Sequence, residues 1–299
     1  MYFLNEEERR LLLRRYLPQA RETAVSEELR GWNWPAPPLA PVYSSTLGVS
    51  EVAGRYCPTA RDVYLRRVLD VRPRPNAAMA EGSYYHAIVA EVILRAKQAI
   101  YRDGGSSLPA LEGLEEPDSP ALPAPAGEAA KANGDLLWRY QARRIAARAA
   151  DAMARQPRAG TDALAAAILP VTVEQQLDGA FLGLSHGVRV DAVHFGEAMV
   201  ADLKFGRRER FHRIGLAGYA MVLESLREQP INLGYIVYVD FRDGRVTVER
   251  DLHVIGDELR QWFVDERDEK ARSVELELDP GIAEECPEDC PYYFACHAA

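Results

Sequence analysis

The placement of the cysteines is the feature of this sequence that most limits how the chain can fold. Cys57 stands near the front, whereas Cys286, Cys290 and Cys296 lie within the last fourteen of the 299 residues. Thiols divided in this way suggest one site that forms when the two ends of the chain fold together. Clustered cysteines in a protein of the reducing cytoplasm bind metal more often than they form disulfides.

The spacing in the cysteine-rich tail differs from the commonest zinc motif. Cys286-x3-Cys290-x5-Cys296 lacks the two-residue spacing of many zinc knuckles. Proline follows Cys57, Cys286 and Cys290, and its missing N–H suits the irregular backbone of a cluster-binding loop. Four thiolates can hold a [4Fe–4S] cluster, a [2Fe–2S] cluster or Zn²⁺, and the residues alone leave all three open. His297 could replace one thiolate, although a solvated tail residue explains it better.

Composition and charge exclude some classes of protein. A hydrophobic content of 47% supports a packed core. The sequence contains no run of about 18 apolar residues, so we expect no membrane span. The charged start resembles an amphipathic helix and not a signal peptide, which predicts a cytoplasmic protein. The net charge of −9 excludes a surface that is basic throughout, but not a local channel for nucleic acid.

The sequence pattern divides the chain into three regions. Residues 1–77 are predicted to form a helical N-terminal part that contributes one cysteine, and residues 276–299 form the cysteine tail. Residues 78–275 are predicted to be the core. Apolar spacing indicates helices near residues 5–18, 78–101, 135–156, 213–228 and 255–272.

Residues 103–134 differ in composition from the rest of the core. They are rich in Gly, Pro, Ala and acidic residues and contain almost no aromatic side chain. Such a segment can bury little surface, so we predict a surface insertion and not a domain.

The pattern changes to a period of two after residue 170. Strands are predicted within residues 171–187, 188–196, 198–206, 233–241 and 245–253. The expected fold is therefore α/β in the mixed α+β sense: a small mixed sheet flanked by helices, with a helical front half.

Two aspartates and a lysine lie on the two predicted strands that flank the turn around Gly196. Asp191 is five residues before Gly196 and Asp202 is six after it, so a hairpin would place them close together. Adjacent carboxylates repel unless a cation holds them, and oxygen ligands favour Mg²⁺ or Mn²⁺. Lys204, on the same strand face as Asp202, could position water or stabilise charge on a phosphate. An ordinary ion pair on an exposed strand remains the alternative.

His86 strengthens the metal-site reading, because an imidazole on a helix could complete such a site for a transition ion. The order of motifs resembles the RecB-like nucleases of the restriction-endonuclease-like superfamily. The motifs are Gly82-x3-His86, Gly187-x3-Asp191, Asp202-x-Lys204 and a helix that carries Tyr219.

The cysteine layout resembles the iron–sulfur branch of these nucleases. That branch includes AddB-type helicase–nucleases and the CRISPR-associated exonuclease family numbered four among Cas proteins. A short chain without a helicase favours the CRISPR family. The segment CPTARDVYLRRVL and the preceding WNWP resemble its crenarchaeal subtype I-A variant.

The resemblance implies roles for individual residues. His86, Asp191 and Asp202 would bind catalytic Mn²⁺ or Mg²⁺, with the Leu203 carbonyl as a further ligand. Lys204 would activate water or stabilise the transition state. The resemblance also favours a structural [4Fe–4S] cluster at the four cysteines.

Contacts to DNA are implied for the aromatic end of the family's Gln-x3-Tyr motif, which is Tyr219 here. The position of the family's glutamine is occupied by Gly215. Basic side chains for DNA are available at Arg207 and Arg208.

Three functions follow from the sequence. The first is a DNA exonuclease that trims spacer precursors, acts on single strands or free ends, and works with the CRISPR integrase proteins of the spacer-acquisition complex. The second is a catalytically weak DNA-binding or assembly subunit of that complex, which the Gly215 departure would permit. The third is a RecB-like DNA-repair nuclease outside CRISPR.

Overall fold

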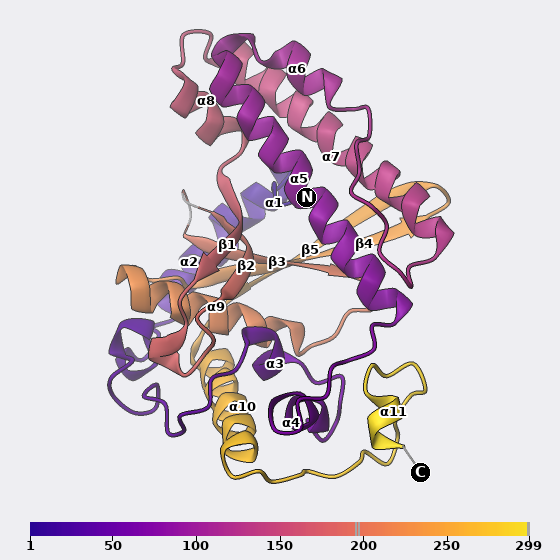
Figure 1. The fold of residues 1–299 in the computed structure, drawn as a ribbon. Coiled ribbons are helices and arrows are strands. Elements are labelled where there is room, and N and C mark those ends of the chain that lie inside the picture. Colours follow the sequence, from indigo (N-terminus) through magenta and orange to yellow (C-terminus); the bar gives the residue numbers. More distant parts are fainter. Residues whose placement is uncertain (195, 197, 298–299) are drawn as a thin grey trace.

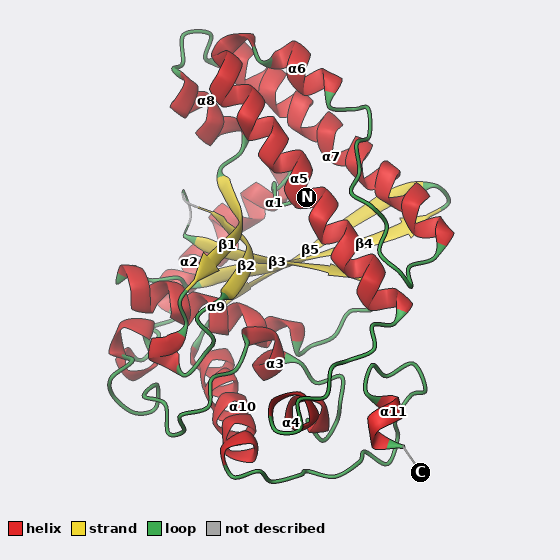
Figure 2. Ribbon diagram, in the orientation of Figure 1, coloured by secondary structure: helices red, strands yellow, loops and turns green. Residues whose placement is uncertain are grey.

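The computed structural model describes residues 1–194, 196 and 198–297. Its centre is a five-stranded mixed sheet with helices on both faces (Figures 1 and 2). The strands follow one another across the sheet in chain order: β1 (Val171–Leu177), β2 (Val188–His194), β3 (Met199–Phe205), β4 (Leu233–Arg242) and β5 (Arg245–Val254). Only β3 and β4 are parallel neighbours, and the other pairs are antiparallel.

One face of the sheet is covered by α9 (His212–Arg227), which connects β3 to β4. A parallel pair needs such a crossover, because a tight turn reverses the chain direction. Helices α10 (Asp257–Glu275) and α3 (Val49–Ala53) pack on α9. Buried residues of these helices and of the sheet, among them Val200, Ile236 and Phe263, form one hydrophobic core.

The other face carries a lobe of four helices, at the top of Figure 1. They are α5 (Ala77–Asp103), α6 (Leu108–Gly113), α7 (Glu128–Arg155) and α8 (Thr161–Ile168). The apolar stripe predicted on the first of them is correct, since Ile88, Val92 and Ala96 are fully buried. Asn76 caps this helix by accepting a hydrogen bond from the backbone N–H of Met79.

The first residues form one nearly continuous helix, and both chain ends contribute short elements. The N-terminal elements are α1 (Glu6–Leu11), the π-helical turn η1 (Leu12–Tyr16), α2 (Leu17–Glu22) and the 3-10 turns η2 (Glu27–Leu29) and η3 (Gly31–Asn33). The remaining short elements are α4 (Arg61–Arg67), η4 (Gly104–Ser106), η5 (Ala180–Leu182) and α11 (Tyr293–Cys296). Of the helices that the structure describes, none combines the length and hydropathy needed to span a bilayer.

The predicted mixed α/β fold and the predicted helices and strands are confirmed, with one clear difference. Helix α7 begins at Glu128 and not near residue 135, because the first five residues of this stretch, EAAKA, have high helix propensity. Leu111 and Ala130 are buried in the core. The expectation that residues 103–134 bury little surface is therefore wrong for the two helical parts of that segment.

Candidate functional site

Strands β2 and β3 separate where the two predicted aspartates come together. Their ladder runs from His194 and Met199 to Ala192 and Ala201, and the next residues in this register are Asp191 and Asp202. At that position the Asp191 carboxylate accepts a hydrogen bond of 2.7 Å from the backbone N–H of Leu203. The Asp191 carboxylate thus accepts the backbone hydrogen bond that a carbonyl of β2 would otherwise accept.

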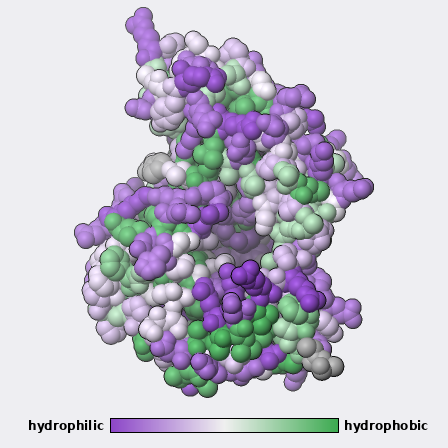
Figure 3. Space-filling view, in the orientation of Figure 1, coloured by the Kyte–Doolittle hydropathy of each residue, from purple (hydrophilic) through white to green (hydrophobic). Residues whose placement is uncertain are grey.

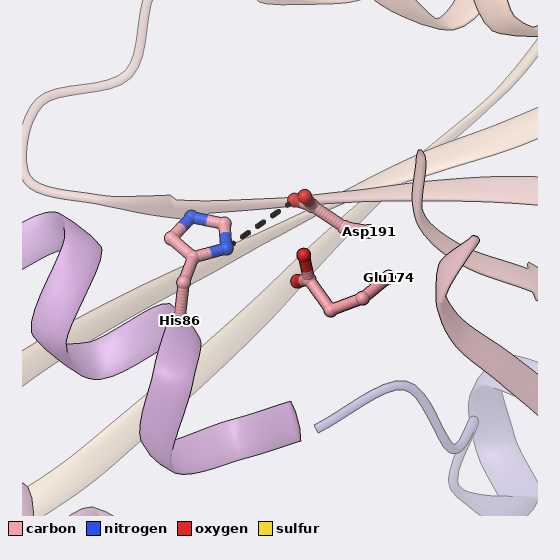
Figure 4. A group of neighbouring side chains, drawn as sticks. All are labelled: His86, Glu174 and Asp191. Atoms are coloured by element: carbon pink, nitrogen blue, oxygen red, sulfur yellow. Dashed lines mark ion pairs between the residues drawn. The ribbon is translucent and has the colours of Figure 1, made fainter. Parts of the chain in front are cut away.

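Three metal-ligand side chains converge beside this position (Figure 4). His86 on α5, Glu174 on β1 and Asp191 on β2 each place one ligand atom within 4.8 Å of the others. His86 Nδ1 lies 3.6 Å from Asp191 Oδ2. One imidazole nitrogen and two carboxylate oxygens form a donor set that suits Mn²⁺ and related ions. The donor set therefore fits the cation that the sequence predicts.

Glu174 has an unusual backbone for a strand residue. Its φ is 51°, in the left-handed region, although Val173 and Gln175 on either side pair normally with Ala192 and Val190. A non-glycine residue in this region costs of order 1 kcal/mol and persists only where its surroundings hold it. The two flanking pairs hold Glu174 opposite Asp191.

Lys204 and Asp202 form a tight ion pair on the α9 side of the site. Lys204 Nζ lies 2.7 Å from Asp202 Oδ2, and the aspartate side chain is only 5% exposed. Burial by itself would lower the pKa of Lys204, but the charges of Asp202 and Asp191 outweigh burial and raise it. The lysine therefore stays a cation, suited to stabilising negative charge and not to accepting a proton.

The pKa values of His86 and Asp191, on the α5 side of the site, shift in opposite directions, and burial is the main cause of both shifts. Burial lowers the pKa of His86 to about 4, although the Asp202 charge and a hydrogen bond with the Leu203 backbone favour its charged form. Burial, followed by the Asp202 charge, raises the pKa of Asp191 well above its usual range. At neutral pH the imidazole is neutral, as a metal ligand must be.

A small pocket opens next to the ion pair. Its volume is about 80 Å³, and Asp202, Lys204, His212, Gly215 and Tyr219 are among its lining residues. Tyr219 is only 9% exposed, so it belongs to the pocket wall and not to the outer surface. A side chain at Gly215 would meet only Ala53, whose Cβ would be 3.7 Å from the new Cβ.

The surroundings of the site are polar and concave. Figure 3 shows a hydrophilic hollow between the α5–α8 lobe and the part of the molecule that contains α3 and α4. The side chain of Arg207 is 90% exposed and that of Arg208 is 52% exposed, and both follow β3. Arg207 pairs with Glu209 and Arg208 with Glu249. The predicted basic side chains thus remain accessible on this loop.

The four cysteines come together as the sequence predicts. Cys57, Cys286, Cys290 and Cys296 are free thiols, and all four line one pocket beside α4. Burial raises the pKa of Cys286, and charge on the other three thiols raises it further. The group offers the donor chemistry of an iron–sulfur cluster or of zinc.

Contacts outside the thiols also hold the tail in place. The Arg61 guanidinium donates two hydrogen bonds of 2.8 Å to Asp279. The backbone N–H of Arg74 donates to the Pro291 carbonyl at 2.9 Å, and its side chain lies over Phe294 at 3.9 Å. These contacts join the tail to α4 and to the segment between α4 and α5, which leads into the helix that carries His86.

Sequence reasoning overlooked Glu174 and His212. Glu174 could have been found from its place in a strand that pairs with the strand of Asp191. The register of the two strands cannot be read from the sequence, however, because ten residues connect them. His212 begins α9, and its ring lies 3.0 Å from the Tyr56 hydroxyl and 3.2 Å from the Tyr238 hydroxyl. Those partners are distant in sequence, so no local pattern could have indicated them.

The fold and the site define a mixed α/β protein with a carboxylate, histidine and lysine cluster at two separating strands. Comparison with known proteins gives the family. The family described as CRISPR-associated exonuclease Csa1 matches residues 1–299, and the chain belongs to that family. A protein of that name from Thermoproteus tenax is 34% identical over 287 residues, which cover 96% of this chain and 97% of the relative. Another, from Saccharolobus solfataricus, is 35% identical over 276 residues, or 91% and 92% of the two chains.

Proposed function

We propose that this chain is a metal-dependent DNA exonuclease of CRISPR adaptation, with a RecB-like core, that trims the ends of spacer precursors. One observation carries the proposal: His86 on α5, Asp191 on β2, and Asp202 and Lys204 on β3 meet at one position. Membership of the Csa1 family of CRISPR-associated exonucleases supports the exonuclease activity and the link to CRISPR. Integrase proteins of the spacer-acquisition complex are the proposed partners.

His86, Glu174 and Asp191 would hold the cation, with Asp202 and the Leu203 carbonyl beside them. A bound Mn²⁺ or Mg²⁺ supplies a Lewis acid and an acidified water. Lys204, kept protonated by the two aspartates, would stabilise negative charge on the phosphate in the transition state. The neutral His86 keeps a nitrogen lone pair available for the metal.

The four cysteines are proposed to hold a [4Fe–4S] cluster with a structural role. Their thiols come from the loop after α3 and from the tail, so a cluster would connect segments more than 200 residues apart in the sequence. Binding free energy at such a site contributes directly to folding. The donor set also admits [2Fe–2S] or Zn²⁺, and metal analysis distinguishes the three.

The proposed activity is tested by digestion of end-labelled and covalently closed circular DNA in Mn²⁺. The wild type should shorten the linear substrate from its ends and leave the circle intact. Lys204→Ala should lower the rate by about 100-fold or more, because it removes a group that acts on transition-state charge. Lys131→Ala, at an exposed lysine of the helical lobe, is the matched control and should retain the wild-type rate.

A catalytically weak DNA-binding or assembly subunit is the second candidate, and Gly215 favours it. The residue leaves the pocket without a polar side chain at that position. DNA binding by the wild type without any cleavage in Mn²⁺ or Mg²⁺ would establish this second function. A repair nuclease outside CRISPR fits the same site, but the family name argues against it.

A further inference from the structure

Tyr56 combines an exposed ring with a fixed position. It lies in the loop between α3 and α4 and is 71% exposed, the highest value among the large apolar and aromatic side chains of the described residues. Its hydroxyl is nevertheless held 3.0 Å from Nε2 of His212. The Phe211 ring meets it edge to face, with centroids 4.9 Å apart and planes at 89°. An aromatic face ordered in advance loses little conformational entropy when a ligand stacks on it.

The contacts that hold Tyr56 extend through His212 and Tyr238 to the guanidinium of Arg208. His212 Nδ1 lies 3.2 Å from the Tyr238 hydroxyl, and the Arg208 guanidinium lies over the Tyr238 ring at 5.1 Å. An exposed aromatic ring and an exposed arginine are therefore fixed within one set of contacts. Sites for single-stranded nucleic acid combine these two components, since bases stack on aromatic rings and arginine attracts the phosphates.

Tyr56 also forms one wall of the pocket that contains Asp202 and Lys204. The pocket volume of about 80 Å³ is well below the roughly 300 Å³ of pockets that enclose small ligands. A nucleobase must therefore remain outside the pocket. The exposed ring of Tyr56 offers an aromatic surface at the rim.

We propose that Tyr56 is a stacking platform for an unpaired base at the end of a DNA strand, which brings the adjoining phosphate to Lys204. The inference rests on the proposed nuclease function and adds the side chain that would recognise an unpaired terminal nucleotide. A blunt duplex would first have to unpair its terminal base, at a cost in free energy.

Binding measurements with a catalytically silent protein test this proposal. In a Lys204→Ala background, the affinity for a short single strand is compared with that for strands carrying an abasic residue at the 5′ or the 3′ end. The loss of the terminal base at one of the two ends should weaken binding about tenfold. Tyr56→Leu should weaken binding of the intact strand by a similar factor and should add nothing when the base is absent.

Two control variants separate stacking from a structural effect. Tyr56→Phe loses the hydroxyl but keeps the ring, and should retain most of the affinity. Tyr101→Leu removes an exposed tyrosine at the far end of α5 and should have no effect. The abasic strands test the protein without any change at Tyr56, so a Leu variant that fails to fold leaves the test intact.

The platform would be refuted if Tyr56→Leu weakened binding of the abasic strand as much as binding of the intact strand. It would also be refuted if neither Tyr56→Leu nor the abasic residue weakened binding. The proposed nuclease function is tested separately, by cleavage with the wild-type protein. Cleavage without coupling between Tyr56 and the terminal base would refute this inference alone. Coupling in a protein that never cleaves would refute the hydrolysis and leave the platform standing.

Discussion

Burial decides the charge of each group in the candidate site. His86 is neutral because its ring is desolvated, whereas Lys204 stays charged because two aspartates outweigh the same desolvation. Asp202 is tied to the lysine, so the carboxylates grouped with His86 are those of Glu174 and Asp191. Glu174 is therefore the residue whose role most needs a direct test.

Glu174→Gln should weaken Mn²⁺ binding by about tenfold or more, because a neutral amide replaces a charged ligand of similar shape. Isothermal titration with Mn²⁺ in the absence of DNA measures the change. Glu174→Gly should weaken Mn²⁺ binding similarly while raising the thermal midpoint, since glycine adopts a φ of 51° without strain. Unchanged Mn²⁺ affinity in both variants would show that Glu174 is not a ligand.

At the scale of elements, helix α9 fixes the geometry of the pocket by packing closely on its neighbours. Two of its glycines occupy different environments. A Cβ at Gly218 would lie 2.4 Å from Cε2 of Phe263 on α10, whereas a Cβ at Gly215 would lie 3.7 Å from Ala53. The first glycine permits close helix packing, and the second borders the pocket.

These environments predict opposite effects of the same substitution. Gly218→Ala should destabilise the protein by about 1–3 kcal/mol, since the methyl group overlaps a buried ring. Gly215→Ala should stabilise it by about 0.5–1 kcal/mol, because alanine favours the helix and has room. Urea denaturation of the two variants provides the comparison, and equal effects would contradict the packing described for α9.

The segment between α5 and α7 should respond to deletion in two different ways. Removal of residues 106–132 should lower stability, because it removes α6, buried Leu111 and the first turn of α7. The Trp138 Nε1 hydrogen bond to the Leu114 carbonyl, 2.6 Å long, would also be lost. Replacement of residues 116–125 alone by a short Gly/Ser linker should keep the thermal midpoint near that of the wild type. Equal tolerance of both deletions would restore the view of the whole segment as a surface insertion.

At the scale of the whole molecule, the cysteine site brings the loop that carries Cys57 and the C-terminal tail together beside the candidate active site. Anaerobically purified protein should be brown, with broad absorbance near about 400 nm. Cys290→Ala should lose iron and unfold at a lower temperature, since a ligand shared between distant segments is gone. Tyr293→Phe, in the same tail, should keep its iron. Stoichiometric zinc without iron in the wild type would refute the cluster.

Histidines whose pKa is lowered by desolvation make the stability of the molecule depend on pH. Burial lowers the pKa of His86, His194 and His253 to about 4 from an ordinary value of 6.5. Between these values the unfolded chain binds more protons, so the free energy of unfolding should fall as pH decreases from about 6.5 to 4. The raised pKa of Asp191 acts in the opposite direction, because the folded protein retains that proton.

Thermal denaturation of metal-free protein across this pH range tests the histidine effect. His194→Gln should reduce the slope of the thermal midpoint against pH, since it removes one of the histidines with a lowered pKa. A midpoint that is independent of pH in the wild type would contradict the burial of these histidines.

The sequence by itself determined the order of elements and the two groups of chemical residues. Periods of two and of 3.6 residues are local properties, so the strands, the helices and the stripe on α5 could be predicted before any contact was known. The turn predicted around Gly196 indicated that Asp191 and Asp202 lie close together, and the unequal division of the cysteines indicated a site formed by distant segments.

Only the tertiary structure decided how these groups meet. Glu174 joins His86 and Asp191 through the register of β1 and β2, which a connection without regular pattern does not reveal. Tyr56 and His212 are separated by 156 positions in the sequence, yet the packing of α3 on α9 brings them into hydrogen-bond contact. The charge states of His86 and Lys204 likewise depend on burial and on neighbours from other elements, which no stretch of sequence contains.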